Sequence, residues 1–134
     1  MVIIICWFRP AKPSDIEKVE IQFDDNDGCW SNVGMITGGG NRLNLASGCV
    51  RHKRTVQHEL LHSAGIWHEQ SRPDRDDYVE IHTECIQEGE EHNFKKHISS
   101  NTYNLPYNPE SIMHYGSEYF TKASGECKTI TSKV

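Results

Sequence analysis

Short apolar runs separated by glycine, proline and acidic clusters dominate the first third of the chain. Residues 2–8 form a β-branched and aromatic run that an Arg-Pro pair ends, which predicts a buried strand followed by a loop. Residues 19–23 alternate between apolar and polar, which predicts a strand with one buried face. Further strands are expected at 29–36 and at 42–46, because glycine-containing turns follow both segments. The pattern predicts short strands separated by turns.

One helix is indicated by its periodicity, at residues 55–64. Its apolar side chains recur at steps of three and four residues, at Val56, Leu60, Leu61 and Ala64. Gly65 then supplies a helix stop, since glycine tolerates the left-handed conformation that ends many helices. A strand or turn is expected at 78–81, and a weaker pattern allows a second helix from Glu84 to His97. From residue 99 onward, Asn, Pro, Gly and Ser predict irregular structure.

Charge and length limit the class of protein. The 134 residues carry 14 Lys and Arg against 19 Asp and Glu, a formal net charge of −5, and the basic residues are scattered. Binding to nucleic acid or to a membrane is therefore not expected. The longest apolar run is far shorter than the about 20 residues of a membrane-spanning helix, and no convincing signal peptide is present. The length predicts a single domain, 1–134, since domains cluster at about 100 to 150 residues.

The chain has five cysteines, while only 36% of its residues are hydrophobic. Covalent or metal cross-links are therefore expected to supplement a thin apolar core, which favours an oxidising compartment over the cytosol. The odd number leaves one thiol unexplained.

Residues 58–62 form the pattern H-E-x-x-H within the predicted helix. Positions four apart lie within about 40° of each other around a helix and about 6 Å apart along it, so His58 and His62 can reach one ion. A catalytic zinc usually takes three protein ligands and a water, and a turn at Gly65 would bring His68 to the same ion. A chance match explains H-E-x-x-H alone quite often, but the full pattern H-E-x-x-H-x-x-G-x-x-H far less often.

The full pattern resembles that of the metzincins and, with Glu69 directly after the third histidine, the astacin family of zinc metalloendopeptidases. The segment Ser111-Ile112-Met113-His114-Tyr115 resembles the Met-turn of that family. Residues 28–34 and 46–50 resemble the strand ends that a family disulfide joins. The three motifs occur in the family's order, and the resemblance runs from about Cys6 to about Ile130.

This resemblance implies both a fold and a chemistry. The fold would be α+β and zincin-like, with a small, twisted, mostly parallel sheet packed on the active-site helix and an irregular C-terminal subdomain that holds the Met-turn. One Zn²⁺ per chain would be bound by His58, His62 and His68. Glu59 would act as general base on a metal-activated water that hydrolyses peptide bonds in proteins. Tyr115 would hydrogen-bond the oxyanion, and Met113 would lie beneath the metal.

The resemblance also concerns the cysteines and the compartment. Cys29 and Cys49 would form a disulfide. Cys6, without its usual family partner, is expected to be free or to pair with Cys127 or Cys85. Together with the cysteine usage, the resemblance implies a secreted or extracellular protein whose partner is a protein or peptide substrate. The sequence predicts neither the cleavage specificity nor the oligomeric state.

The chain departs from the family pattern at both ends. Astacins have a strand and a long helix before the first cysteine and a final helix after the Met-turn, and neither is found in 1–134. The single peptidase domain is therefore expected to be truncated. A catalytically weak or silent zinc-binding fragment is the alternative function, which zinc binding without proteolysis would favour. A fragment that does not fold alone is a third hypothesis, which the lack of a cooperative unfolding transition would favour.

Other suggestive residues have simpler explanations. Surface positions are expected for the histidines that lack ligand spacing, His52, His82, His92 and His97, while His114 would be a neighbour of the site. The acidic cluster at 24–28 is expected to be a solvated turn, because Phe23 and Gly34 occupy positions where an EF-hand needs calcium ligands. Residues 42–46 are expected to face the core, and the family resemblance adds the role of an edge strand that pairs with an extended substrate.

Overall fold

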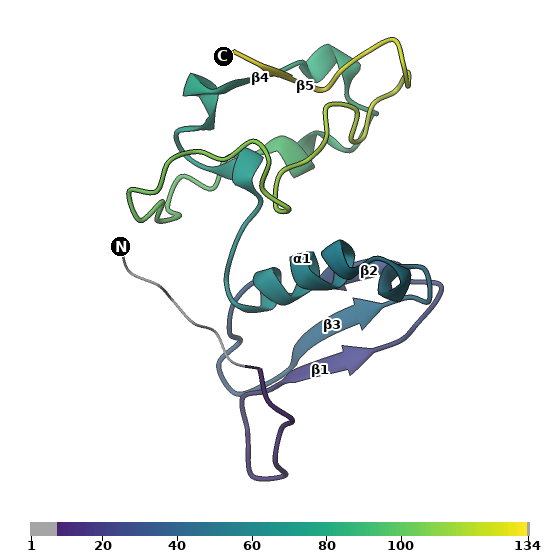
Figure 1. The fold of residues 1–134 in the computed structure, drawn as a ribbon, viewed down its shortest axis with the longest axis vertical. Coiled ribbons are helices and arrows are strands. Elements are labelled where there is room, and N and C mark those ends of the chain that lie inside the picture. Colours follow the sequence, from purple (N-terminus) through teal and green to yellow (C-terminus); the bar gives the residue numbers. More distant parts are fainter. Residues whose placement is uncertain (1–7, 134) are drawn as a thin grey trace. The chain divides into compact units, whose positions relative to one another are not determined.

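The structure, a computed structural model, describes residues 8–133 and divides into two compact units (Figure 1). The first unit ends at Ile66 and the second begins at Trp67. Each unit has its own cluster of buried apolar side chains. Apart from Phe8, the strand expected at 2–8 lies outside the described residues.

The first unit contains a three-stranded sheet. Its strands lie in the order β1 (Val19–Gln22), β3 (Asn41–Leu45), β2 (Cys29–Ser31). β1 runs parallel to β3 and β2 runs antiparallel to it. The strands predicted at 19–23 and 42–46 are confirmed. The sheet of the described residues is mixed, so the expectation of a mostly parallel sheet holds for the β1–β3 pair and not for β2.

β3 is the central strand of this sheet, and the prediction that it is an edge strand is wrong. Its backbone pairs with β1 on one side and with β2 on the other, so it has no open side to which an extended peptide could bond. Leu43 and Asn44 are both fully buried although they face opposite sides of the sheet. The expected core-facing role is therefore correct.

β2 is shorter than predicted, because the chain leaves the sheet after Ser31. Gly34 has a φ of +72°, a left-handed conformation that ends the extended backbone. Its N–H donates to the carbonyl of His62 at 2.9 Å and so contacts the helix end rather than a neighbouring strand. The expected strand 29–36 is thus a strand of three residues followed by a loop.

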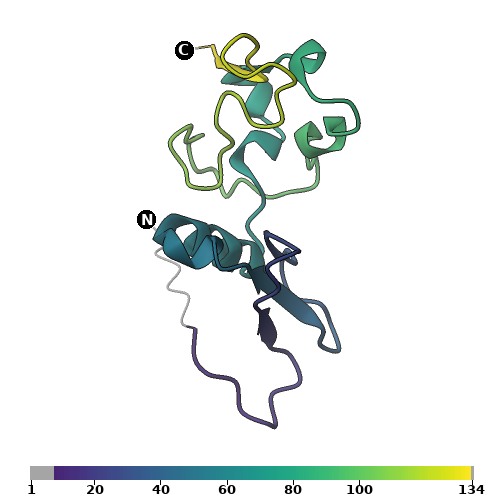
Figure 2. The ribbon, with the colours of Figure 1, turned by 90° about the vertical axis from the view of Figure 1, so that its right-hand side faces the viewer.

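Helix α1 (Lys53–Ser63) confirms the predicted helix and follows a short 3-10 turn, Cys49–Arg51. It lies against one face of the sheet (Figure 2), where Val56 and Leu60 pack against the buried core of β3. At its end, Gly65 donates to the carbonyl of His62, and Ile66 donates to that of Leu61. These two bonds, with a φ of +94° at Gly65, form the Schellman motif of a glycine-terminated helix. No described helix is long and apolar enough to cross a membrane.

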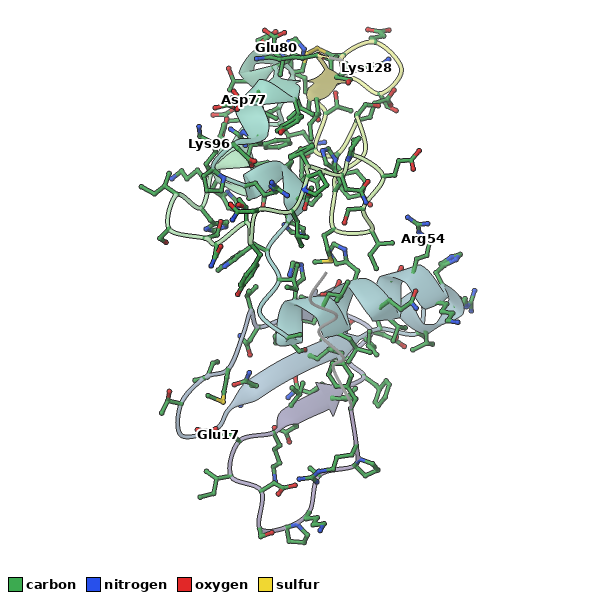
Figure 3. The ribbon with its side chains drawn as sticks, turned by 60° about the vertical axis from the view of Figure 1, so that its left-hand side comes forward. Glu17, Arg54, Asp77, Glu80, Lys96 and Lys128 are labelled. Carbon is green, nitrogen blue, oxygen red and sulfur yellow. A yellow bond between two sulfur atoms is a disulfide. The ribbon has the colours of Figure 1, made fainter. Side chains whose placement is uncertain are left out.

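The second unit is largely irregular, as the sequence predicts. Its regular elements are the antiparallel pair β4 (Val79–Ile81) and β5 (Ile130–Ser132), and four short 3-10 turns at Glu69–Ser71, Arg75–Asp77, Thr83–Cys85 and Glu91–Phe94. Val79, Ile86, Phe94, Tyr107 and Ile130 form its buried cluster. Charged side chains such as Asp77, Glu80 and Lys128 surround the outside of the unit (Figure 3).

The second helix predicted between Glu84 and His97 is wrong. Ile86 instead forms an isolated β-bridge with Thr121, and Gln87 donates to the carbonyl of Phe120 at 2.8 Å. Gly89, with a φ of +91°, interrupts the segment further. Long-range pairing therefore takes up backbone groups that a helix would have bonded locally. The apolar periodicity of this segment is too weak to stabilise a helix by tertiary packing.

Two disulfides cross-link the described residues, one in each unit. Cys29 pairs with Cys49, as predicted, with Cα atoms 5.9 Å apart. Cys85 pairs with Cys127, with Cα atoms 5.5 Å apart. Both separations lie in the normal range for disulfides. The second bond contradicts the alternatives in which Cys6 pairs with Cys85 or Cys127, and Cys6 itself lies outside the described residues.

Replacing Cys85 and Cys127 together with Ala should lower the free energy of unfolding by about 4 kcal/mol, since the bond closes a loop of 42 residues. Removing the Cys29–Cys49 bond, with its separation of 20 residues, should cost about 3 kcal/mol. Urea unfolding of the three oxidised proteins measures both losses. A Cys85/Cys127 variant as stable as its parent would contradict the expectation.

Candidate metal centre and active site

Helix α1 separates core-forming from metal-binding side chains by its own geometry. Val56 and Leu60 point toward the sheet, so His58 and His62, two residues after each, lie on the opposite side of the helix. The two imidazole rings meet edge to face, with centroids 4.6 Å apart. One turn of helix thus presents two nitrogen ligands as a pair, as the spacing predicts.

A backbone carbonyl fixes the orientation of the His62 ring. Nδ1 of His62 lies 2.8 Å from the carbonyl oxygen of Ile66. A carbonyl only accepts, so Nδ1 carries the proton and Nε2 presents its lone pair to a metal. Burial lowers the pKa of His62, and the neighbouring His58 lowers it further, against the opposing effect of the Ile66 bond. These effects favour the neutral imidazole, which is the form that binds metals.

Two glycines support the end of α1 beside His62. The carbonyl oxygen of His62 accepts hydrogen bonds from Gly34 at 2.9 Å and from Gly65 at 2.8 Å. A Cβ built on either glycine would lie 3.7 Å from the Cα of the other, so the two backbones are in close contact. Both have positive φ, which disfavours any other residue at these positions. The loop after β2 therefore anchors the second histidine of the motif.

His58, His62 and His68 form a group that could hold a metal ion, because one nitrogen from each lies within 4.8 Å of the others. Three imidazoles suit zinc and several other transition metals. A site with three protein ligands also leaves a position for water or substrate, as catalytic zinc sites do. The donor set is thus suitable for the predicted Zn²⁺.

Glu59 is a buried carboxyl group next to the first histidine. Only 5% of the residue is exposed, and its Oε2 accepts no hydrogen bond from any described residue. Burial raises the pKa of Glu59 to about 7. A carboxyl group with that pKa can both accept and return a proton near neutral pH, which is what general acid–base catalysis requires.

In the metal-free chain, the buried Glu59 should make stability depend on pH. Its pKa rises from 4.5 to about 7 on folding. Between these values the folded state holds a proton that the unfolded state has lost, so the stabilisation is complete below about pH 4.5 and is lost as the pH rises to about 7. The change should reach about 3 kcal/mol, at 1.36 kcal/mol per pKa unit.

Glu59→Gln provides the matched reference, because effects shared by both chains, including that of His62, cancel in the difference. Urea unfolding from pH 4 to 8 in the presence of a chelator should show the stability advantage of wild type over Glu59→Gln falling as the pH rises. A difference independent of pH would show that the carboxyl group is solvated in the folded chain.

The predicted Met-turn lies in the second unit. Met113 is 2% exposed, and its carbonyl oxygen accepts the N–H of Glu69 at 2.9 Å. The ring of Tyr115 lies 4.5 Å from that of His68, centroid to centroid, and stacks on Tyr119 at 4.9 Å. The structure therefore brings the predicted phenol beside the third histidine.

The other histidines have structural surroundings. His114 places one ring nitrogen 2.6 Å from Tyr107 Oη and the other 2.6 Å from the carbonyl of Tyr115, which agrees with its expected place as a neighbour of the site. His52 and His92 are exposed, as predicted. His82 and His97 are half-buried rather than exposed, since His82 bonds Thr131 and His97 stacks on Trp67.

The acidic cluster at 24–28 is an exposed turn, as expected. Its carboxylates accept hydrogen bonds from the protein: Asp24 from Asn26, Asp25 from Ser47 and Asp27 from the indole of Trp30. The side-chain amide of Asn44 also holds the turn, because it accepts a hydrogen bond from the N–H of Asp24 and donates one to the carbonyl of Asp24. These bonds fix the conformation of the turn.

Sequence analysis missed an ionic network that follows the third histidine. Arg72 binds Glu69 at 3.1 Å and both oxygens of Asp74, and its hydrogen bond to Asp74 lowers the pKa of that carboxyl group. Oε1 of Glu69 also accepts the N–H of Asn108 at 2.8 Å. Arg72 donates to the carbonyls of Leu105 and Pro106 as well. The network fastens the loop before the Met-turn to the segment after His68.

Gln70 is a second residue that sequence analysis missed. It is fully buried, and its Oε1 accepts the N–H of Tyr115 at 3.0 Å. Its place directly after the H-E-x-x-H-x-x-G-x-x-H-E motif was visible, but nothing in the pattern showed that an amide side chain would reach the Met-turn.

An α+β fold with three grouped histidines, a buried glutamate between two of them and a buried methionine is that of a zincin-like protein. The family model for the astacin peptidases matches residues 6–134, so the chain belongs to the astacin family. This family is zinc-dependent, and His58, His62 and His68 are positioned to hold a metal ion. Its members are peptidases, whose substrates are proteins or peptides.

Individual relatives agree with this assignment. Over 125 residues, or 92% of the chain, it is 44% identical to meprin A subunit beta of Mus musculus. Over 104 residues, or 78% of the chain, it is 44% identical to the astacin-like metalloendopeptidase of Gallus gallus. A solved structure, that of high choriolytic enzyme 1, a hatching enzyme zinc-protease from Oryzias latipes, matches with a TM-score of 0.82 and 36% identity, over 91% of this chain and 58% of that one.

The chain spans 17% of the meprin subunit and 25% of the Gallus gallus protein. Two disulfides are typical of a protein that folds in an oxidising compartment.

Proposed function

We propose that this chain is a zinc-dependent endopeptidase that hydrolyses peptide bonds in proteins. Its zinc ligands would be His58, His62 and His68. The observation that carries the proposal is the buried carboxyl group of Glu59, placed beside the first histidine of a group that could hold a metal ion. We further propose that residues 1–134 act as a single peptidase domain that comprises both compact units.

Zinc, when bound, would supply Lewis-acid chemistry that polarises a peptide carbonyl and makes a nearby water more acidic. Glu59 would take a proton from the attacking water. The same carboxyl group would then return the proton to the amine of the departing peptide, so it ends the cycle ionised as it began. Burial keeps this carboxyl group away from bulk solvent, since only 5% of Glu59 is exposed.

Tyr115 would stabilise the negative charge that develops on the carbonyl oxygen, with its phenol as hydrogen-bond donor. Its ring is held by Phe94 at 5.9 Å and by Tyr119 at 4.9 Å, centroid to centroid. Met113, buried and apolar, would have a structural role in the Met-turn.

The proposed partner is a protein or peptide substrate, and the net charge of −5 gives no support to a nucleic-acid or membrane-surface partner. The proposed location is secreted or extracellular, because two disulfides persist best in an oxidising compartment.

Removing zinc and then restoring it tests this function directly. The zinc-loaded chain should cleave an internally quenched peptide, a chelator should stop the reaction, and one equivalent of zinc should restore it. Full zinc binding with no cleavage would favour the alternative, a catalytically silent zinc-binding fragment.

A further inference from the structure

We propose that Gln70 is a positioning residue for the reaction: its buried side-chain amide holds the backbone of Tyr115 so that the phenol stays in place beside His68. This inference rests on the proposed function, in which Tyr115 stabilises the oxyanion. All residues that carry it belong to the second unit.

The segment after His68 bonds the Met-turn at two points. The N–H of Glu69 donates to the carbonyl of Met113 at 2.9 Å, and the N–H of Tyr115 donates to Oε1 of Gln70 at 3.0 Å. The first bond joins main chain to main chain, while in the second a side chain is the acceptor. The position of the Tyr115 backbone therefore depends on which side chain stands at position 70.

Gln70 is itself held rigidly. Its carbonyl oxygen accepts from Nη1 of Arg75 at 2.9 Å, and Nη1 also donates to the carbonyl of Phe94 at 2.5 Å. Arg75 is 9% exposed and Gln70 is fully buried. Phe94 in turn contacts the ring of Tyr115 edge to face. One buried guanidinium thus fixes both the residue that holds the Tyr115 backbone and a residue that contacts its ring.

An amide at this buried position has a specific use. Its Nε2 has no acceptor among residues 8–133, and burying an unpaired donor is unfavourable. An apolar side chain of similar volume, such as Met, would avoid that cost. What Met could not supply is the acceptor for the N–H of Tyr115. The bond to Tyr115 is therefore the contribution that distinguishes Gln70 from an apolar residue.

The expected effect is on turnover rather than on binding. A misplacement of about 1 Å at a reacting centre can reduce the rate by about 10²-fold. Gln70→Met should lower kcat by about 10-fold or more, with KM within about 2-fold and zinc content unchanged. Gln70→Glu keeps the acceptor oxygen and should recover most of kcat. The exposed Gln57 provides a control, and Gln57→Met should leave kcat unchanged.

A double-mutant cycle separates positioning from general structural damage. In the Tyr115→Phe background the phenol is already absent, so Gln70→Met should lower the remaining kcat by less than about 2-fold. An equal loss in both backgrounds would overturn the proposal. If Gln70→Met fails to fold, Gln70→Asn takes its place in the cycle, because its shorter side chain withdraws the oxygen while staying polar.

Hydrogen exchange supplies a readout that does not need activity. In the zinc-loaded protein, NMR should show the amide of Tyr115 exchanging about 10-fold faster or more in Gln70→Met than in wild type, with the amide of Glu69 unchanged. Unchanged protection at Tyr115 would overturn the positioning role. A wild-type chain that cleaves no peptide would contradict the proposed function, while the Tyr115 amide would still decide whether Gln70 holds the Met-turn.

Discussion

Glu59→Gln should lower peptide hydrolysis by about 10²–10⁴-fold while the chain keeps one zinc. The substitution preserves the size of the side chain and its helix propensity, and it leaves the three histidines intact. It removes the carboxyl group that would accept the proton of the attacking water and return it to the leaving amine. In the wild type that group is buried beside the first of the three histidines.

The measurement is kcat/KM on an internally quenched peptide, with zinc determined on the same samples. Glu88→Gln is the matched control, since Glu88 is exposed and the same charge is lost. It should retain the activity of the wild type. Glu59→Gln with undiminished hydrolysis would show that another group accepts the proton.

His62→Ala should weaken zinc binding by more than about 100-fold. Losing only a residue that hydrogen-bonds a metal ligand already costs about 10–100-fold in affinity, and here a ligand itself is lost. His62 is proposed as one of three protein ligands, and its ring is already oriented by the bond to Ile66. Removing the imidazole also leaves a cavity, because His62 is buried, with only 5% of the residue exposed. Both effects reduce affinity, but only the loss of the ligand nitrogen acts on the metal directly.

Competition with a chromophoric chelator measures the affinity. His92→Ala is the control, since His92 is exposed and bonds only a nearby carbonyl, that of Gly89, among the contacts seen in the structure. Its zinc affinity should equal that of the wild type. Equal affinities for His62→Ala and wild type would remove His62 from the metal site.

The metal-binding part of the site could be predicted from the sequence because its geometry is local. A four-residue step along one helix places His58 and His62 together, and Gly65 ends that helix in the left-handed conformation its residue type favours. The Tyr115 assignment depended on a family resemblance, since 47 residues separate it from His68. No local pattern connects positions so far apart.

Two of the failed predictions share a physical cause, which is long-range backbone pairing. The family resemblance implied an edge strand at residues 42–46, but pairing with β1 and β2 on both sides places them at the centre of the sheet. The segment 84–97 could have been helical by composition, yet Ile86 pairs with Thr121 and Cys85 bonds Cys127. Gln70 was missed for the same reason, because its partner lies 45 residues away.

As proposed above, this chain would cleave internal peptide bonds with a zinc-dependent site. The most direct test is mass spectrometry of an unfolded, alkylated substrate protein after incubation with the zinc-loaded chain. Internal cleavage products should appear, and they should be absent when a chelator has removed the zinc. A chain that holds one zinc and yields no internal cleavage product would contradict the proposed function.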